Sequence, residues 1–149
     1  MVDKFMGDCV MAIFGAPEEM IQDTQIKKAV ECAMAMQAAL NELNQRWLEK
    51  GIREFSMRIG IHAGSGIVGS FGSEMRAEYT VIGPIVNLAS RIEKAAGPGD
   101  IYFSAVVRDH LESGGWVRVG TFNLKGIGDT ALFKIKRGYE AADKVKKAA

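Results

Sequence analysis

Residues 78–99 read EYTVIGPIVNLASRIEKAAGPG and hold a strand, a turn and a helix in immediate succession. The aromatic and β-branched run at 78–82 is typical of a strand. Pro84 stands at the first position of a helix, where its missing N–H costs nothing. The helix pattern covers 85–96 and stops at Gly97-Pro98-Gly99. This segment therefore predicts a helix that packs its apolar side against a sheet.

Strand and helix patterns alternate on both sides of this segment. The order of these patterns predicts an α+β fold with a mixed sheet and helices packed on it. The expected strands cover residues 2–6, 9–14, 55–62, 67–68, 101–103, 116–124 and 131–136. Besides 85–96, the expected helices are a long one, capped by Asp23 or Thr24 and ending at Gly51, and a short one from Ser104 to Leu111.

The composition is that of one globular domain. The chain has 149 residues, of which 48% are hydrophobic and 25% charged, with a net charge of +1. A charge near zero gives no broad attraction to nucleic acid or to an anionic membrane. No apolar run approaches the roughly 18–20 residues that span a bilayer, and the N-terminus does not resemble a signal peptide. We expect no nucleic-acid partner, no membrane contact by this segment, and a cytoplasmic protein or the cytoplasmic domain of a larger one.

The two cysteines do not suggest a disulfide or a zinc site. Cys9 and Cys32 each lie in an apolar stretch, so we expect both to be small buried hydrophobic residues. The run at 9–14 is continuously apolar and bounded by turn residues, which predicts a strand buried on both faces.

Three short segments are candidates for chemistry, each with a simpler alternative. Asp8 lies at a glycine-tightened hairpin tip, where an exposed carboxylate suits a hard cation, although Gly-Asp is also an ordinary turn. Asn87 and Arg91 are four residues apart on one helix face, which suits a sugar and a phosphate or simply solvent. Lys125 lies in a tight turn between two strands, and by itself it indicates no more than a turn.

Taken together, these segments resemble the class III adenylate/guanylate cyclase catalytic domain. The matching motifs are Lys-x-x-Gly-Asp at 4–8, Thr-x-x-Gly-x-x-x-Asn-x-x-x-Arg at 80–91 and Leu-Lys-Gly at 124–126. Residues 57–64, MRIGIHAG, also look like the central strand pair of that family. The resemblance implies a ferredoxin-like mixed sheet, with a catalytic domain over residues 1–137 and a C-terminal tail at 138–149.

The resemblance implies an adenylate cyclase, which converts ATP to 3′,5′-cyclic AMP and pyrophosphate. In that family two divalent cations, Mg²⁺ or Mn²⁺, are held by two aspartates, and Asp8 matches the second of them. Lys4 and Thr80 match the residues that read adenine. The remaining matches are Asn87 for the ribose, Arg91 for the charge that develops at the α-phosphate, and Lys125 for the terminal phosphates.

The family's site lies between two protomers, so the resemblance implies a head-to-tail homodimer with two equivalent sites. Nothing in the sequence matches the strand that carries the first metal aspartate of the family. We therefore expect weak or no activity from these 149 residues alone, and a parent protein with regulatory domains fused upstream.

Two other functions compete with this interpretation. The chain could be an inactive regulatory or dimerisation module that keeps the cyclase fold. A diguanylate cyclase is disfavoured because Gly7-Asp8 is followed by Cys9, so the Gly-Gly-Asp-Glu-Phe hairpin of that family is absent from the sequence. A nucleic-acid-binding sandwich is disfavoured by the neutral charge and by the lack of an aromatic strand surface.

Overall fold

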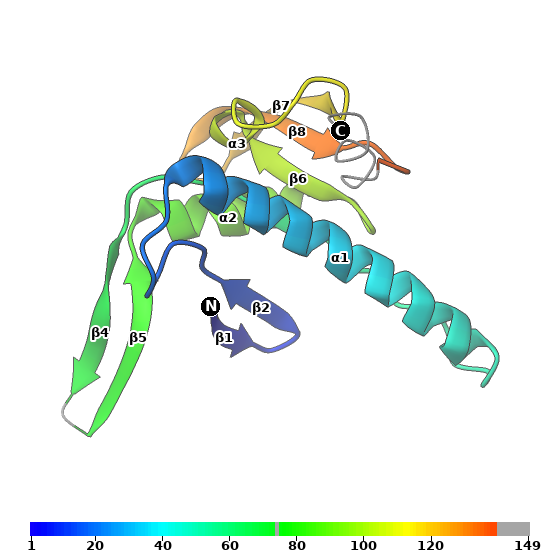
Figure 1. Ribbon diagram of the computed structural model, residues 1–149, viewed down its shortest axis with the longest axis horizontal. Helices are drawn as coiled ribbons and strands as arrows, with labels where there is room; N and C mark the ends of the chain where they lie inside the picture. The colour runs from blue at the N-terminus through cyan, green and yellow to red at the C-terminus, as the bar shows by residue number, and fades with distance from the viewer. Residues whose placement is uncertain (74, 140–149) are drawn as a thin grey trace, which may run out of the picture.

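The computed structural model describes residues 1–73 and 75–139, and it confirms the α+β class (Figure 1). The helices are α1 (Gln22–Leu48), α2 (Pro84–Ala95) and α3 (Ala105–Arg108). The strands are β1 (Val2–Met6), β2 (Cys9–Ala12), β3 (Ile59–Ile61), β4 (Ile67–Ser73), β5 (Arg76–Ile82), β6 (Ile101–Ser104), β7 (Trp116–Leu124) and β8 (Gly128–Ile135). None of the helices in these ranges is long and apolar enough to cross a membrane.

A four-stranded mixed sheet forms the centre of the molecule, with the order β3-β6-β8-β7. β3 is parallel to β6, whereas β8 is antiparallel to both of its neighbours. β6 is buried along its whole length because side chains from both faces of the sheet are covered. One face packs against α1, through a cluster that includes Ile26, Val30, Ile101, Phe103 and Phe133. The other face packs against α2, through Ile92, Ala96, Tyr102, Leu124 and Leu132.

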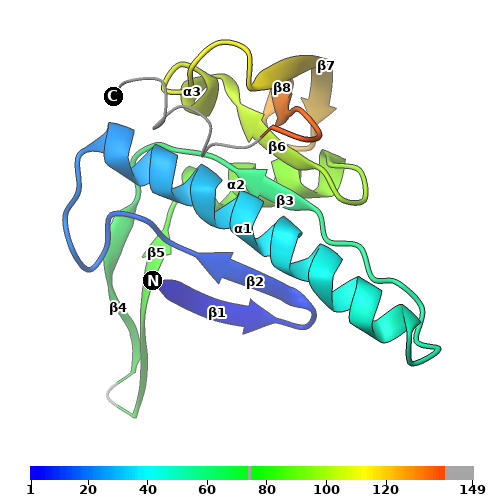
Figure 2. The same cartoon turned by 45° about the vertical axis from the view of Figure 1, so that its right-hand side comes forward.

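Two hairpins lie outside this sheet. Among residues 1–73 and 75–139, β1 pairs only with β2, and β4 pairs only with β5, both antiparallel. In Figures 1 and 2 both hairpins extend below α1, while β6, β7 and β8 lie above it. Their apolar side chains are poorly covered, since Phe5 is 77% exposed and Ile67 is 68% exposed. The hairpins therefore add little to the hydrophobic core.

The prediction of a doubly buried strand at 9–14 is wrong. β2 covers only Cys9–Ala12, and three of its four residues are exposed. Within the described residues β2 has a single neighbouring strand, so one edge and most of its surface remain open. The predicted burial of Cys9 and Cys32 is wrong as well, because both are exposed. Cys32 lies on the outer side of α1, next to Ala33, which faces the core.

The predicted strand at 55–62 is shorter than expected. Only Ile59–Ile61 pairs with a neighbour, and Phe55 is 55% exposed. Side chains of α1 take the backbone hydrogen bonds that a neighbouring strand would have taken. Asn44 Oδ1 accepts from the Phe55 N–H at 2.9 Å, and Asn44 Nδ2 donates to the Phe55 carbonyl at 2.7 Å. Gln37 Nε2 donates to the Met57 carbonyl at 2.7 Å.

The boundaries of the other elements follow the sequence closely. α2 begins at Pro84, as predicted. α1 begins at Gln22, before the predicted capping residues, and no side chain caps it. The short helix ends at Arg108, earlier than Leu111, and β8 begins at Gly128 rather than at 131. Most of the predicted tail at 138–149 lies outside the described residues.

Candidate functional site

The two residues matched to base reading meet through a carboxylate that sequence reasoning missed. Lys4 is on β1 and Thr80 is on β5. Thr80 Oγ1 donates a hydrogen bond of 2.9 Å to Asp3 Oδ2, across 77 positions of the chain. Lys4 Nζ lies 3.9 Å from the same oxygen. Asp3 therefore joins the first hairpin to the second.

The surroundings of this cluster differ in exposure. The side chain of Asp3 is 1% exposed, and Thr80 is 6% exposed. Lys4 is partly open at 32%, and its Nζ donates to Glu78 Oε2 at 3.0 Å. Glu78 is on β5 as well, so a second contact ties the two hairpins. Lys4 and Thr80 thus form one polar cluster, with its opening at Lys4.

α2 presents the predicted ribose and phosphate residues as the helical spacing requires. Asn87 is exposed and Arg91 is half-buried. Ile92, next to Arg91, is completely buried, and Leu88 packs against the same cluster. The prediction that this helix packs its apolar side against a sheet is confirmed. Asn87 and Arg91 are therefore carried by a helix with a firmly packed opposite side.

A close approach between β3 and α2 fixes the height of this helix above the sheet. Gly60 on β3 lies so near α2 that an added Cβ would fall 2.2 Å from the Glu93 backbone nitrogen. It would also fall 2.7 Å from the Ala89 carbonyl oxygen. Only glycine fits there, because both neighbours are backbone atoms that cannot rotate away.

Lys125 also lies on the packed body of the molecule, which is the four-stranded sheet with the helices that cover it. It is exposed in the turn between β7 and β8, where Gly126 adopts a φ of +78°. Its neighbour Leu124 is buried in the same cluster as Ile92. Since Arg91 adjoins Ile92 and Lys125 adjoins Leu124, the two cations project from segments that share one core.

Asp8 lies at the tip of the first hairpin, beyond the end of β1. It is exposed in the two-residue turn of the first hairpin, after Gly7 with its φ of +65°. Two strand residues, Phe5 and Met6, and the turn residue Gly7 separate it from Lys4 along the chain. No group of three or more His, Cys, Asp or Glu that could hold a metal ion is found in residues 1–73 and 75–139. By itself Asp8 therefore offers one ligand, the kind of contribution that suits a cation shared with phosphate oxygens and water.

The predicted residues thus lie in two groups, and Asp8 belongs to neither of them. Lys4 and Thr80 are joined through Asp3, whereas Asn87, Arg91 and Lys125 belong to the packed body. No hydrogen bond or ion pair links the two groups in the described part of the chain. The only sequence signal for Asp3 is its place directly before Lys4, the first residue of the motif at 4–8.

His62 is held by a neighbouring strand and has a shifted pKa. It follows β3, is half-buried, and its Nδ1 lies 2.8 Å from Ser104 Oγ. Burial lowers the pKa of His62 by disfavouring the charged imidazolium.

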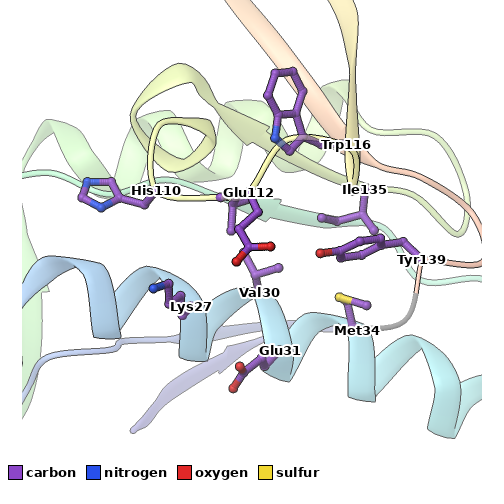
Figure 3. Close-up of a pocket in the computed structure, with 11 residues that line it drawn as sticks. Lys27, Val30, Glu31, Met34, His110, Glu112, Trp116, Ile135 and Tyr139 are labelled. Atoms are coloured by element: carbon purple, nitrogen blue, oxygen red, sulfur yellow. The ribbon is translucent and has the colours of Figure 1, made fainter. Parts of the chain in front are cut away.

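A separate pocket lies between α1 and the end of the sheet (Figure 3). Its volume is about 150 Å³, and none of the predicted site residues lines it. The residues around it include Lys27, Val30, Met34, His110, Trp116 and Tyr139.

Comparison with known proteins places these observations in a family. The profile described as the adenylate and guanylate cyclase catalytic domain matches residues 3–137. Adenylate cyclase 1 of Rhizobium meliloti is 36% identical over 127 residues, which are 83% of this chain. The match covers 19% of that relative, so the chain spans about a fifth of its length.

Solved structures agree with the fold. The adenylyl cyclase CyaB from P. aeruginosa superposes with a TM-score of 0.87 at 33% identity, covering 93% of this chain and 72% of that one. The guanylyl cyclase Cya2 superposes with a TM-score of 0.78 at 34% identity, covering 94% of this chain and 73% of that one. The two are similar in identity although their names give different nucleotides, so overall likeness does not decide the base.

Proposed function

Because this chain belongs to the adenylate and guanylate cyclase catalytic domain family, we propose that it converts ATP to 3′,5′-cyclic AMP and pyrophosphate. The observation that carries the choice of ATP is the cluster in which Asp3 joins Lys4 to Thr80. A lysine ammonium donates to the ring nitrogen N1 of adenine, which is an acceptor. The threonine hydroxyl lies beside it for the exocyclic amine.

The reaction itself is a displacement at the α-phosphate. The ribose 3′ oxygen attacks the α-phosphorus, the new O3′–P bond closes the ring, and the bond to the bridging oxygen of the β-phosphate breaks. Pyrophosphate leaves with that electron pair, and the 3′ hydroxyl proton passes to solvent. The protein forms no covalent intermediate, so its contribution is positioning and electrostatic stabilisation.

The residues of the packed body supply that contribution. Asn87, exposed on α2, orients the ribose so that its 3′ oxygen faces the phosphorus. Arg91, one turn further on, donates to the α-phosphate oxygens as negative charge builds on them. Lys125, in the β7–β8 turn, holds the terminal phosphates and the departing pyrophosphate. Donors fixed by a buried core need little rearrangement during the reaction, which is why their placement on α2 matters.

We propose that Asp8 ligates Mg²⁺ or Mn²⁺ together with the triphosphate. Two such cations, when bound, neutralise the phosphates and activate the attacking oxygen. Asp8 fits this role because its carboxylate is exposed at a two-residue turn. One carboxylate does not make a cation site without the nucleotide, so metal and ATP should bind together.

We also propose a head-to-tail homodimer. Asp8 and Lys4 stand at different positions along one hairpin, and no contact links the base cluster to Arg91 in the described part of the chain. A second copy would let Asp8 of one protomer act on the nucleotide that is read by the other. Each copy carries both sets of residues, so the symmetric pair would hold two equivalent sites.

Nucleotide binding by the purified chain tests the proposal. We expect ATP to bind only with Mn²⁺ present, Asp8→Asn to weaken that binding, and Asp109→Asn, a matched change at a remote exposed carboxylate, to leave it intact. Formation of cyclic AMP and pyrophosphate is then measured on the same preparation, where we expect a weak rate or none, because no residue in this sequence matches the first metal aspartate of the family. Absence of binding at millimolar ATP would favour the second candidate, a regulatory or dimerisation module with a cyclase fold.

A further inference from the structure

We infer that Asp3 selects adenine over guanine by fixing the direction of the Thr80 hydroxyl proton. The inference rests on the proposed function, because it concerns the base of the nucleotide that this site cyclises. Asp3 itself would touch no substrate. It would act through Thr80 and is therefore a positioning residue.

The geometry of Asp3 leaves one arrangement of this hydrogen bond. The side chain is 1% exposed, and Oδ2 lies 2.9 Å from Thr80 Oγ1. The other oxygen, Oδ1, is buried and accepts no hydrogen bond within residues 1–73 and 75–139. Because both side chains are buried, solvent does not compete with Thr80 as a hydrogen-bond donor to Asp3 Oδ2.

The chemistry of the pair then sets the polarity of the site. A carboxylate oxygen only accepts hydrogen bonds, and a threonine hydroxyl has a single proton to donate. The proton of Thr80 is therefore directed at Asp3. The lone pairs of Thr80 Oγ1 remain, so toward a ligand Thr80 is an acceptor. Lys4 has N–H donors and no acceptor. The site therefore presents a donor group at Lys4 and an acceptor group at Thr80.

This pattern matches the edge of adenine and not the edge of guanine. Adenine offers an acceptor at N1 and a donor at its N6 amino group, whereas guanine offers an N1–H donor and the O6 acceptor. Adenine thus pairs with Lys4 and Thr80 together. Guanine in the same position would face Lys4 with a donor and Thr80 with an acceptor. Each unpaired donor or acceptor costs about 1–3 kcal/mol when it is buried, which corresponds to roughly 5-fold to 150-fold in affinity.

The Lys4–Glu78 pair does not prevent this recognition. To reach N1 of the base, Lys4 Nζ has to leave Glu78 Oε2, its partner at 3.0 Å. The side chains are 32% and 62% exposed, and exposed pairs of this kind contribute about 0–1 kcal/mol. The exchange is therefore inexpensive, whereas the buried contact between Asp3 and Thr80 stays in place.

The test compares the affinities of the chain for ATP and for GTP, both with Mn²⁺, in four proteins. These are the wild type, Asp3→Asn, Thr80→Val and the double variant. Asparagine has the size of aspartate but can turn an N–H toward Thr80, which frees the hydroxyl proton for guanine O6. We expect Asp3→Asn to lower the ratio of ATP affinity to GTP affinity at least 10-fold. Adding it to Thr80→Val should change that ratio no further.

Other results overturn the inference in recognisable ways. If Asp3→Asn weakens ATP and GTP equally, and does so in the Thr80→Val background too, Asp3 merely supports the fold. If the ratio is unchanged, Asp3 does not set specificity. A wild-type chain that binds neither nucleotide overturns the proposed function and this inference with it. A chain that binds ATP with the same preference over GTP in every variant overturns only the inference.

A second pair of variants covers the case in which Asp3→Asn does not fold. Thr80→Ser keeps a hydroxyl that can donate to Asp3, so it must retain the preference for ATP. Thr80→Val keeps the shape of the side chain but has no hydroxyl, so it must lower the ratio of ATP affinity to GTP affinity to the share that Lys4 supplies alone. A Thr80→Val protein with the ratio of the wild type contradicts the inference without any change at Asp3. Asp109→Asn, which removes one exposed carboxylate beside Arg108, is the control for charge.

Discussion

The four-stranded sheet and the two hairpins of this domain are held together by different forces. β6 is buried on both faces, between α1 and α2, and Phe103 at its centre is completely covered. On β1, by contrast, Phe5 is 77% exposed. An isolated two-stranded hairpin is marginally stable in water. The hairpins are linked to each other by polar contacts, from Asp3 to Thr80 and from Lys4 to Glu78.

This difference divides the proposed chemistry as well. The residues proposed for the phosphates and ribose stand on the packed body, where a buried core fixes them. The residues proposed for the base and the cation stand on the hairpins, whose relative position depends on a few polar contacts. Changes in the body should therefore act on folding and on the rate of the reaction, and changes in the hairpins on nucleotide choice.

The largest effect is expected from Phe103→Ala. Its ring is 0% exposed and stacks on Phe133 with centroids 6.3 Å apart. Removing a buried phenylalanine ring costs about 3–5 kcal/mol of unfolding free energy, from lost transfer energy and the cavity that remains. Urea unfolding measures the change. A loss below 1 kcal/mol would show that β6 is not the core of the fold.

Phe5→Ala is the matched control in the other region. In a single copy of the chain its exposed ring predicts a change within about 0.5 kcal/mol. The measurement is repeated at higher protein concentration. An effect that grows with concentration would show that a second copy covers this hairpin, as the proposed dimer requires.

Arg91→Ala should act mainly on the rate. Arg91 is half-buried on α2, and its proposed task is to meet charge that develops in the transition state. Loss of one such donor lowers kcat by about 10²–10³. We expect the ATP affinity to fall far less, and the unfolding midpoint to stay close to that of the wild type. Arg137→Ala, at an exposed cation at the end of the sheet, is the control. Equal losses in both variants would contradict the role.

Gly60→Ala tests the contact that carries Arg91. The added methyl group would fall within 2.2 Å of the Glu93 backbone, so α2 has to move away from β3. Overpacking of this kind costs about 1–3 kcal/mol. Both the unfolding free energy and the rate of cyclic AMP formation should fall, because α2 carries Asn87 and Arg91. Gly99→Ala has open space around its Cβ but a φ of +78°, so it should cost stability without affecting the rate. A Gly60→Ala protein with normal activity would contradict the coupling.

The parts that were predictable from sequence have local causes. Pro84 indicates the start of α2 because proline suits the first position of a helix. Gly7 indicates the first hairpin turn because glycine readily adopts the positive φ that it has there. The spacing of Asn87 and Arg91 places them on one face whatever lies opposite. These features depend on a few neighbouring residues, so the sequence contains them directly.

The parts that were missed depend on distant partners. Residues 55–58 alternate like a strand, yet the side chains of Asn44 and Gln37 on α1 form hydrogen bonds with backbone groups of this segment. The importance of Asp3 lies in the hydrogen bond that it accepts from Thr80, which is 77 positions away in the sequence. Likewise the apolar run at 9–14 predicts burial, but no element within the described residues covers most of it. Pairing partners of this kind cannot be read from one segment alone.

The smallest effect is expected from His62, where β3 meets the start of α3. Burial lowers the pKa of His62 below 6.5, the ordinary value that the unfolded chain keeps. As the pH falls through about 6.5, the unfolded state takes up the proton first, so the unfolding free energy decreases. It continues to decrease until the pH reaches the lower pKa of the folded state. His62→Gln can keep a hydrogen bond with Ser104 but has no proton to gain, so the loss between about pH 7 and 5 should be smaller in this variant. Equal pH dependence in both proteins would mean that His62 is as well solvated in the fold as in the unfolded chain.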